Sequence, residues 1–239
     1  MFKERSYRGW VQSDDLVSFE VKEKETDLFI LAGKDLEGQA RESVLNHRSS
    51  IEKYIMKNAE FYSSLVPVAV DKDAPEIIKA MAEASRKAEV GPMAAIAGAV
   101  AEFVGRDMLA FTDQVIVENG GDIFLKTSKV RTMGIYAGER SPFTGNLAIR
   151  IEPDENGLGV CTSSGTVSHS LSFGHADAAL IVSKDTALAD AAATVAGNAV
   201  KGEGDIEKAI NMARSIKGVT GVLILINDKM GSWGEIKLV

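Results

Sequence analysis

The sequence predicts an α+β protein in which antiparallel strands and helices are grouped into separate blocks. Three observations carry this prediction. Two strand-like segments precede a long helical region, four strand-like segments occupy the middle, and a strand, two helices and a hairpin close the chain. Helices and strands that come in runs, and do not alternate singly, are typical of α+β folds. Because no segment rich in Pro, Gly or Ser interrupts the 239 residues, we expect one domain spanning 1–239.

The first half of the chain begins with strands and continues with helices. Residues 17–32 predict two short strands around a charged turn. Apolar residues recur at helical spacing from Asp35 to about Ser63, and a short helix is expected over 76–90. Gly91-Pro92 then opens another helix, because Pro suits the first helical position. The body of that helix is almost entirely small or apolar, which predicts burial and close packing.

The second half repeats this order loosely. Short turns separate four strand-like segments, so an antiparallel meander is expected over 114–126, 130–138, 144–152 and 158–163. After them the sequence predicts a strand at 176–183, helices at 185–200 and 205–216, and a hairpin that turns around Asp228 to Gly231. Strands at both chain ends would leave unpaired edges, so a homo-oligomer is a reasonable expectation.

Composition narrows the class of protein and the class of partner. The net charge of −7 and the pI of about 5.1 oppose binding to nucleic acid or to an anionic membrane. Cys161 is the only cysteine, so no intrachain disulfide can form. The charged start MFKERSYRGW has no signal-peptide pattern, and no apolar run approaches the roughly 20 residues of a membrane span. We therefore expect a cytoplasmic protein that binds a small molecule.

A pair of glycines marks the first candidate site, Asn119-Gly120-Gly121-Asp122. One interpretation is a hairpin turn, since Asn-Gly is a strong turn signal, and this would split 114–126 into two strands. The other is a ligand contact, in which the glycines allow close approach to the main chain and Asn119 and Asp122 orient polar groups.

The second candidate site is the run of small hydroxyl residues Thr162-Ser163-Ser164-Gly165 at a strand end. Successive main-chain N–H groups in such a turn can bind an anion, although a Ser/Thr loop with local side-chain bonds is common. His169 follows closely, so a Ser–His nucleophile pair is conceivable, but no acidic partner stands at motif spacing. Cys161 fits a buried small side chain better than a functional thiol.

The third candidate site is Asp190 with Thr194, four residues apart on an Ala-rich helix. This spacing puts both side chains on one face, and carboxylate plus hydroxyl oxygen suits Mg²⁺ or Ca²⁺. The alternative is an aspartate of the first helical turn with Thr194 bonded back to a carbonyl. The helix start at Gly91-Pro92-Met93 is a weaker candidate for holding a phosphate.

These segments together resemble motifs of the ApbE family of flavin transferases. Its N-x-G-G-D segment resembles Asn119-Gly120-Gly121-Asp122, its T-S-G turn resembles Thr162-Ser163-Ser164-Gly165 with one extra serine, and its A-D-x-x-x-T helix resembles residues 189–194. The motifs occur in the family's order over roughly residues 90–200. The whole chain is most similar to the shorter, cytosolic branch called uncharacterised protein family 0280, to which GPMAAIAGA and CTSSGTVSHSLSFGHADAA point.

The resemblance implies two intertwined T-fold-like halves, antiparallel sheets covered by helices, with an FAD site in the groove between them. It also implies that Asp190 and Thr194 hold Mg²⁺, as in the transferases, which cleave FAD and pass FMN to a threonine of a target protein. On the same basis the segments Asn119 to Asp122 and Thr162 to Gly165 are candidate cofactor-binding residues for FAD or FMN.

One departure from the family pattern keeps three functions open. The transferases carry H-I-I-D-P after the T-S-G turn, whereas the nearest match here is His169-Ser170-Leu171-Ser172-Phe173, with neither Asp nor Pro. His169 is thus the one candidate catalytic residue. The hypotheses are a Mg²⁺-dependent FMN transferase or FAD pyrophosphatase, a non-catalytic flavin or nucleotide binder, and a different small-molecule enzyme linked to sulfur assimilation.

Overall fold

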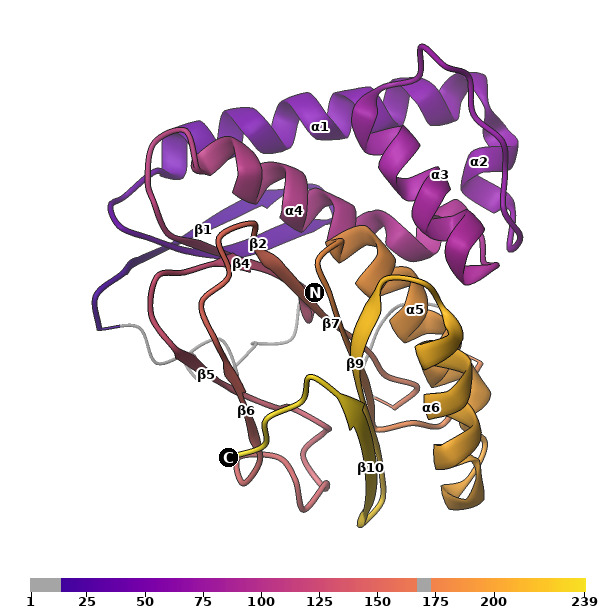
Figure 1. Ribbon diagram of the computed structural model, residues 1–239. Coiled ribbons are helices and arrows are strands. Elements are labelled where there is room, and N and C mark those ends of the chain that lie inside the picture. Colours follow the sequence, from indigo (N-terminus) through magenta and orange to yellow (C-terminus); the bar gives the residue numbers. More distant parts are fainter. Residues whose placement is uncertain (1–13, 167–172) are drawn as a thin grey trace.

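A computed structural model describes residues 14–166 and 173–239 (Figure 1). Eight strands form one antiparallel sheet, in the spatial order β1-β2-β3-β4-β7-β8-β9-β10. Their bounds are β1 Val17–Glu23, β2 Thr26–Ala32, β3 Val115–Asn119, β4 Asp122–Lys126, β7 Leu158–Ser163, β8 Ala178–Ser183, β9 Val219–Ile226 and β10 Lys229–Gly234. Six α-helices are described: α1 Glu37–Lys57, α2 Ala59–Ser63, α3 Glu76–Ala88, α4 Ile96–Met108, α5 Thr186–Ala199 and α6 Ile206–Ser215.

The sheet consists of two halves with the same order of elements. In the first half two strands, the helices α1 to α4 and two further strands follow one another, and in the second half β7 and β8, the helices α5 and α6, and β9 and β10 do the same. The halves join where β4 pairs with β7, with Asp122 opposite Cys161 and Leu125 opposite Leu158. The predicted α+β fold, with antiparallel strands covered by helices, is confirmed.

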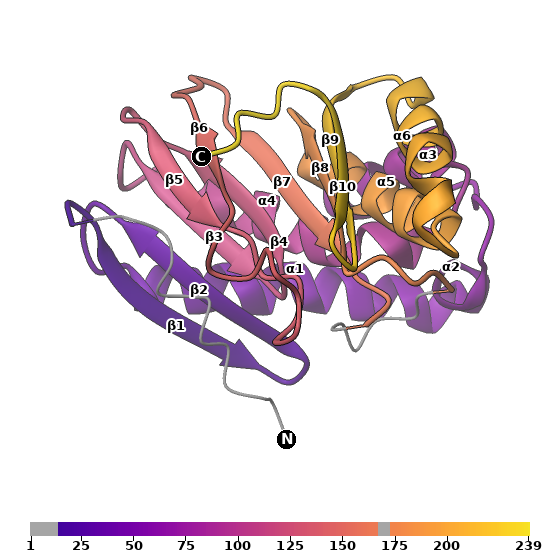
Figure 2. The same ribbon diagram turned by 90° about the horizontal axis from the view of Figure 1, so that it is seen from below.

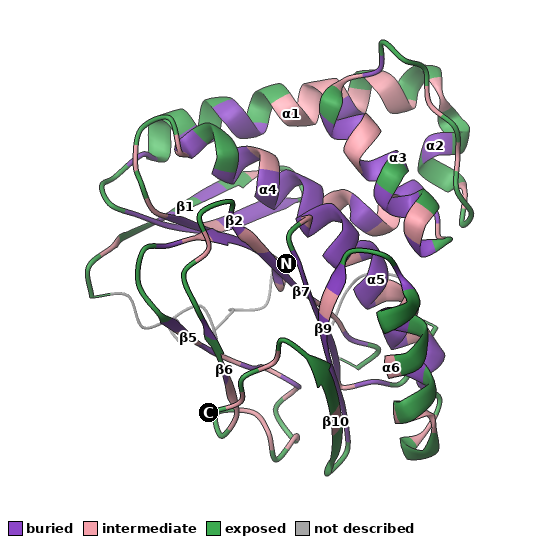
Figure 3. Cartoon of the chain, viewed as in Figure 1, coloured by how far each residue is buried: buried purple, intermediate pink, exposed green. Residues whose placement is uncertain are grey.

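Helices cover one face of the sheet, and a small two-stranded sheet covers the other (Figure 2). This small sheet pairs β5 Arg131–Gly134 with β6 Ala148–Ile151. Burial on both faces explains why β8 and β9 are almost continuously apolar, without the alternation of a half-exposed strand. Buried residues concentrate in α4, α5 and the central strands (Figure 3).

The structure corrects the predicted meander in two places. The segment 114–126 is a hairpin, in which Gly120 and Gly121 form a two-residue turn with φ of 69° and 104°. Positive φ at both central positions is what a type I′ turn requires, so the turn interpretation is confirmed. The segments 130–138 and 144–152 leave the meander, because Met133 and Ile149 of β5 and β6 pack on the open apolar face of the main sheet.

Smaller differences concern helix ends and the last turn. The helix predicted over 35–63 breaks at Asn58 into α1 and α2. The helix predicted from Gly91-Pro92 begins with a 3₁₀ turn over Pro92–Ala95 before α4. The final hairpin turns at Asn227-Asp228, since Ile226 pairs with Lys229, and not at Asp228 to Gly231.

Within residues 14–166 and 173–239, no single helix is long and apolar enough to cross a membrane. The stretch Glu76–Ala88 with Pro92–Met108 meets the length and composition criterion only as a pair bent by 106°.

Candidate functional site

The hairpin between β3 and β4 places the first predicted segment against the start of α4. The Asn119 side-chain amide donates to the main-chain oxygen of Ala97 at 3.1 Å. The Gly121 N–H donates to the Glu118 carboxylate at 2.9 Å. Asn119 therefore fixes the turn relative to the helix, while Asp122, the last residue of the turn, points its side chain into the protein and is only 8% exposed.

The second predicted segment ends β7, beside that hairpin. The Gly165 N–H donates to the Ala176 carbonyl at 2.9 Å, and the Thr166 N–H donates to the Ser164 hydroxyl at 3.2 Å. Two main-chain donors of the expected anion-binding turn are thus occupied by acceptors of the chain itself. The hydroxyl-bearing residues Thr162 and Ser163 are half-buried at the strand end.

Asp190 lies in the second turn of α5 and meets the start of a different helix. The Gly98 N–H of α4 donates to Asp190 Oδ2 at 2.8 Å. The N-cap of α5 is Asp185, whose carboxylate accepts from the Leu188 N–H. The interpretation of Asp190 as a first-turn aspartate of its own helix is therefore wrong. Thr194 lies one turn further along α5 and is half-buried.

The start of α4 is not free to hold a phosphate at Gly91-Pro92-Met93. A Cβ on Gly91 would collide with the main-chain oxygen of Ser64, so Gly91 serves close packing. The anion that the N–H groups of α4 do bind is the carboxylate of Asp190, in keeping with the affinity of helix starts for negative charge.

A closed ring of contacts brings the three predicted segments together. Asn119 joins the hairpin to α4, and Gly98 joins α4 to Asp190 on α5. The ring then closes through β7, where Ser163 lies against Gly197 of α5, at 3.3 Å from the position of an added Cβ. Cys161, two residues before Ser163 on β7, lies opposite Asp122 of the hairpin in the sheet. Residues as far apart in the chain as Gly98 and Asp190, which are 92 positions from each other, thus meet at one point between the two halves.

The electrostatics of this point are unusual, because the buried carboxylate of Asp122 and the half-buried carboxylate of Asp190 influence each other. Burial raises the pKa of Asp190 to about 7, although the N–H groups of Gly98 and Ala97 oppose the shift. Burial also raises the pKa of Asp122 well above its ordinary value, and the negative charges of Asp190 and Glu118 add to the shift. Asp122 Oδ1 is buried and has no hydrogen-bond partner among the described residues.

These oxygens suit a hard divalent cation. A cation between the carboxylates would offset both their desolvation and their mutual repulsion. Across the ranges 14–166 and 173–239, however, no three His, Cys, Asp or Glu side chains gather as a ready metal cluster. Any ion here would need hydroxyl, main-chain or ligand oxygens in addition.

Cys161 is inaccessible at this point. Its side chain is fully buried, and its Sγ donates to the Thr186 carbonyl at 3.4 Å. Burial together with the nearby Asp122 and Asp190 raises the pKa of the thiol well above its ordinary value. The thiol stays protonated at neutral pH, and the interpretation as a buried small side chain is the one the geometry supports.

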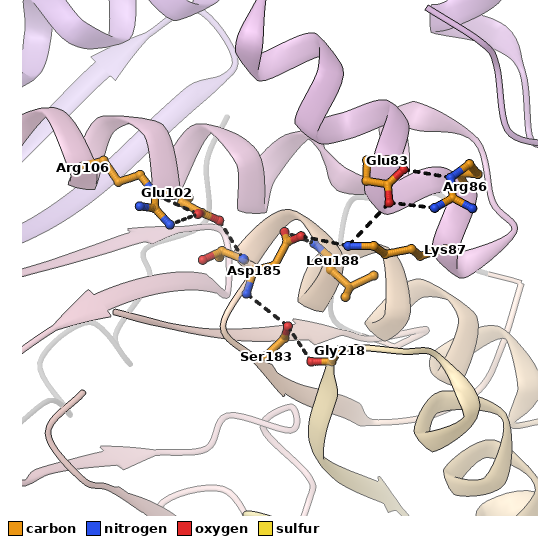
Figure 4. Close-up of polar contacts among 10 residues, drawn as sticks. Glu83, Arg86, Lys87, Glu102, Arg106, Ser183, Asp185, Leu188 and Gly218 are labelled. Carbon is orange, nitrogen blue, oxygen red and sulfur yellow. Dashed lines mark hydrogen bonds and ion pairs between the residues drawn. The ribbon is translucent and has the colours of Figure 1, made fainter. Parts of the chain in front are cut away.

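The N-terminal end of α5 carries a second polar cluster, which was not predicted from the sequence (Figure 4). The Thr186 N–H donates to Glu102 of α4 at 2.7 Å, and Arg106 pairs with Glu102 at 2.7 Å. Asp185 accepts from Leu188 and lies 3.7 Å from Lys87. Glu102 stands between apolar residues on a buried helix, and this buried position is the signal that could have pointed to it.

His169 lies outside the described residues, so its role stays a prediction. Surface hollows of about 560 Å³ along α6 and about 640 Å³ between α3 and Gly218 contain none of the predicted site residues, and we assign no function to them.

Solved structures with this fold define the class of protein. The flavinyl transferase ApbE of Pseudomonas stutzeri superposes with a TM-score of 0.58 at 13% identity, over 92% of this chain and 94% of that chain. The ApbE protein of Thermotoga maritima gives a TM-score of 0.59 at 13% identity, over 90% and 96% of the two chains. The protein therefore has the ApbE fold.

Sequence relatives narrow the class to a family. A family model described as AbpE bacteria matches residues 8–230. A UPF0280 protein of Methanocaldococcus jannaschii is 43% identical over 219 residues, which cover 89% of this chain and 88% of the relative. A UPF0280 protein of Methanococcus vannielii is 40% identical over 228 residues, which cover 93% and 92%. The chain belongs to the ApbE-like UPF0280 family.

Proposed function

We propose that this protein binds a flavin nucleotide together with Mg²⁺ between its two halves, and that it acts as an FMN transferase or FAD pyrophosphatase. The observation that carries the proposal is the convergence of the hairpin, the end of β7 and Asp190 at one point with an unpartnered buried carboxylate oxygen. The structural neighbours that are flavin transferases support the choice of a flavin nucleotide.

In this proposal the site residues bind and orient the ligand. Gly120 and Gly121 carry no side chain and present the main chain of the turn, and Asn119 holds that turn in place through Ala97. The hydroxyls of Thr162 and Ser163 are the donors of the second segment that remain for a phosphate, because Gly165 donates within the chain.

Asp190 and Thr194 would hold the ion, and Mg²⁺ would supply positive charge for the pyrophosphate of the nucleotide. The raised pKa of Asp190 supports this assignment, since a partly desolvated carboxylate without a cationic neighbour is stabilised by a bound cation. Asp190 Oδ2 would still accept the hydrogen bond from the Gly98 N–H, so one carboxylate would contact both the ion and the start of α4.

The deciding experiment incubates metal-stripped protein with FAD, with and without Mg²⁺, and separates the products by chromatography. A threonine-containing peptide is added in a parallel reaction. The proposal expects FMN and AMP, or flavinylated peptide with AMP, only when Mg²⁺ is present. Calorimetry on the same samples measures FAD binding.

Binding without turnover would favour the non-catalytic flavin or nucleotide binder, for which the sequence departure after His169 is the specific reason. Absence of both binding and turnover at millimolar FAD would overturn the proposal. The different enzyme linked to sulfur assimilation would then remain, without Cys161 as its reactive thiol, because that side chain is fully buried.

A further inference from the structure

Asp122 is the buried carboxylate whose charge is least compensated in the site. Its side chain is more than nine-tenths buried, and Oδ1 has no partner among the described residues. The Thr162 N–H donates a hydrogen bond to the carboxylate and the Cys161 thiol lies beside it, yet these neutral groups satisfy it only in part. The charged groups that act on it, Asp190 and Glu118, carry the same sign.

Other acids of the same region are satisfied by their neighbours. Glu102, also buried, accepts from the Thr186 N–H and pairs with Arg106. Glu118 accepts from the Gly121 N–H within the turn. A buried anion without a paired cation is costly, so the position of Asp122 calls for a positive charge that the described side chains do not supply.

The direction of the Asp122 side chain shows which element the missing positive charge would lie against. Asp122 lies opposite Cys161 in the sheet, and Cys161 Sγ contacts the Thr186 carbonyl at the start of α5. Asp122 therefore faces the helix that carries Asp190 one turn later, which agrees with the electrostatic influence of Asp190 on it.

We propose that Asp122 is a third protein ligand of the divalent cation, bound through its free Oδ1 opposite Asp190. This inference rests on the proposed function and adds to it a residue of the hairpin, so that the ion links the β4 strand of the first half to α5 of the second half. Two carboxylates and a hydroxyl leave the remaining positions of an octahedral ion to water and to phosphate oxygens of the ligand.

Substitution of Asp122 by Asn distinguishes a metal ligand from a residue that only stabilises the fold. Asp122→Asn keeps the size and the hydrogen-bond acceptor but removes the buried negative charge. A ligand role predicts that this variant binds Mn²⁺, used as a probe for Mg²⁺, at least about tenfold more weakly, while the metal-free variant melts at the same or a higher temperature. A purely structural role predicts a lower melting temperature and unchanged metal affinity.

The experiment titrates metal-stripped full-length protein with Mn²⁺, followed by electron paramagnetic resonance, for wild type, Asp122→Asn, Asp190→Asn and Asp185→Asn. Asp185 is the matched control, because it is a carboxylate of the same helix at its other polar cluster. The inference expects weaker binding in the first two variants and wild-type binding in the control.

A fourth variant, Asp122→Cys, tests direct contact with the ion. Thiolate prefers soft metals, so this variant should gain affinity for Cd²⁺ over Mn²⁺ relative to wild type, which already contains Cys161. No gain in Cd²⁺ preference, or wild-type Mn²⁺ affinity in Asp122→Asn with Asp190→Asn impaired, would overturn the inference and leave the proposed function standing. Wild-type protein that binds no Mn²⁺, alone or with FAD, would overturn both.

Discussion

The two polar clusters along α5 differ in how their carboxylates are compensated. At the N-terminal end, Asp185 caps its own helix and lies near Lys87, and Glu102 has both the Thr186 N–H and Arg106. One turn further along the helix, the half-buried Asp190 and the buried Asp122 of β4 act on each other without a cation among the described residues. The first cluster is complete, whereas the second lacks a positive charge.

This contrast separates stabilising groups from candidate functional groups. Both clusters join the same two helices, so packing alone cannot account for the difference. Fully paired buried charges stabilise or at least tolerate burial, while uncompensated ones concentrate at functional sites. Four measurements test whether the two clusters differ in function.

The largest effect is expected for Asp190→Asn. The amide keeps an oxygen that can accept from the Gly98 N–H, but it removes the charge that would hold the ion. We expect the affinity for Mg²⁺ in the presence of FAD to fall by about 100-fold, or about 2.7 kcal/mol, as measured by calorimetry. Unchanged Mg²⁺ affinity would mean that the second cluster is structural, like the first.

The next effect concerns the packing of α4 against α5. A Cβ on Gly98 would lie 2.8 Å from Asp190 Cβ and would also collide with the Thr186 carbonyl. Gly98→Ala should therefore lower the free energy of unfolding by about 1–3 kcal/mol, as measured by urea denaturation. Gly38→Ala is the control, because nothing lies within 4 Å of an added Cβ there. Equal stability of the two variants would contradict the packing described for Gly98.

A smaller effect should appear in the pH dependence of stability. Burial raises the pKa of Asp190 from 3.8 to about 7, so the folded state favours the protonated form. The contribution of Asp190 to stability is then fully present below about pH 4 and is lost as the pH rises through 7. Mg²⁺ bound to this carboxylate, as proposed, should restore stability at the upper end of this window.

The measurement is the shift of the melting temperature caused by Mg²⁺ at pH 5 and at pH 8. We expect almost no shift at pH 5 and a rise of about 2–5 °C at pH 8. In Asp190→Asn the shift should be absent at both values. An equal rise at pH 5 and pH 8 in wild type would place the ion away from Asp190.

The smallest effect belongs to the N-terminal cluster. Asp185→Ala removes the acceptor for the Leu188 N–H, and loss of such an N-cap costs about 1 kcal/mol. Urea denaturation should show this loss while Mg²⁺ affinity stays as in wild type. Asp185→Asn keeps a good N-cap and should match wild type in both measurements. A loss of Mg²⁺ affinity in Asp185→Ala would mean that the two clusters form one site.

Local patterns in the sequence predict most of the elements. The periodicity around 76–90 and 185–200 locates α3 and α5 within a few residues, because an apolar face and a cap are local properties. The displacement of β5 and β6 to a separate layer could not be predicted in this way. Their alternating burial fits any half-exposed strand, and only the tertiary fold decides which apolar face they cover.

The candidate site shows the same division. Asp190 stands out in the sequence because an acid among alanines needs a partner, but its actual partner, Gly98, lies 92 residues away. Glu118 and Glu102 were assigned no role, because the partners of these two buried carboxylates are fixed by the tertiary fold and not by the local sequence. The family resemblance supplied the grouping of the three segments, which spacing along the chain does not encode.

A carboxylate on each of the helices α4 and α5 binds the first turn of the other helix, and this affects how the chain folds. Asp190 of the second half binds the first turn of α4, and Glu102 of the first half binds the first turn of α5. Neither half on its own can complete the start of its central helix. The halves should therefore form as one cooperative unit, and a chain cut between β4 and β7 should regain structure only when both pieces are mixed.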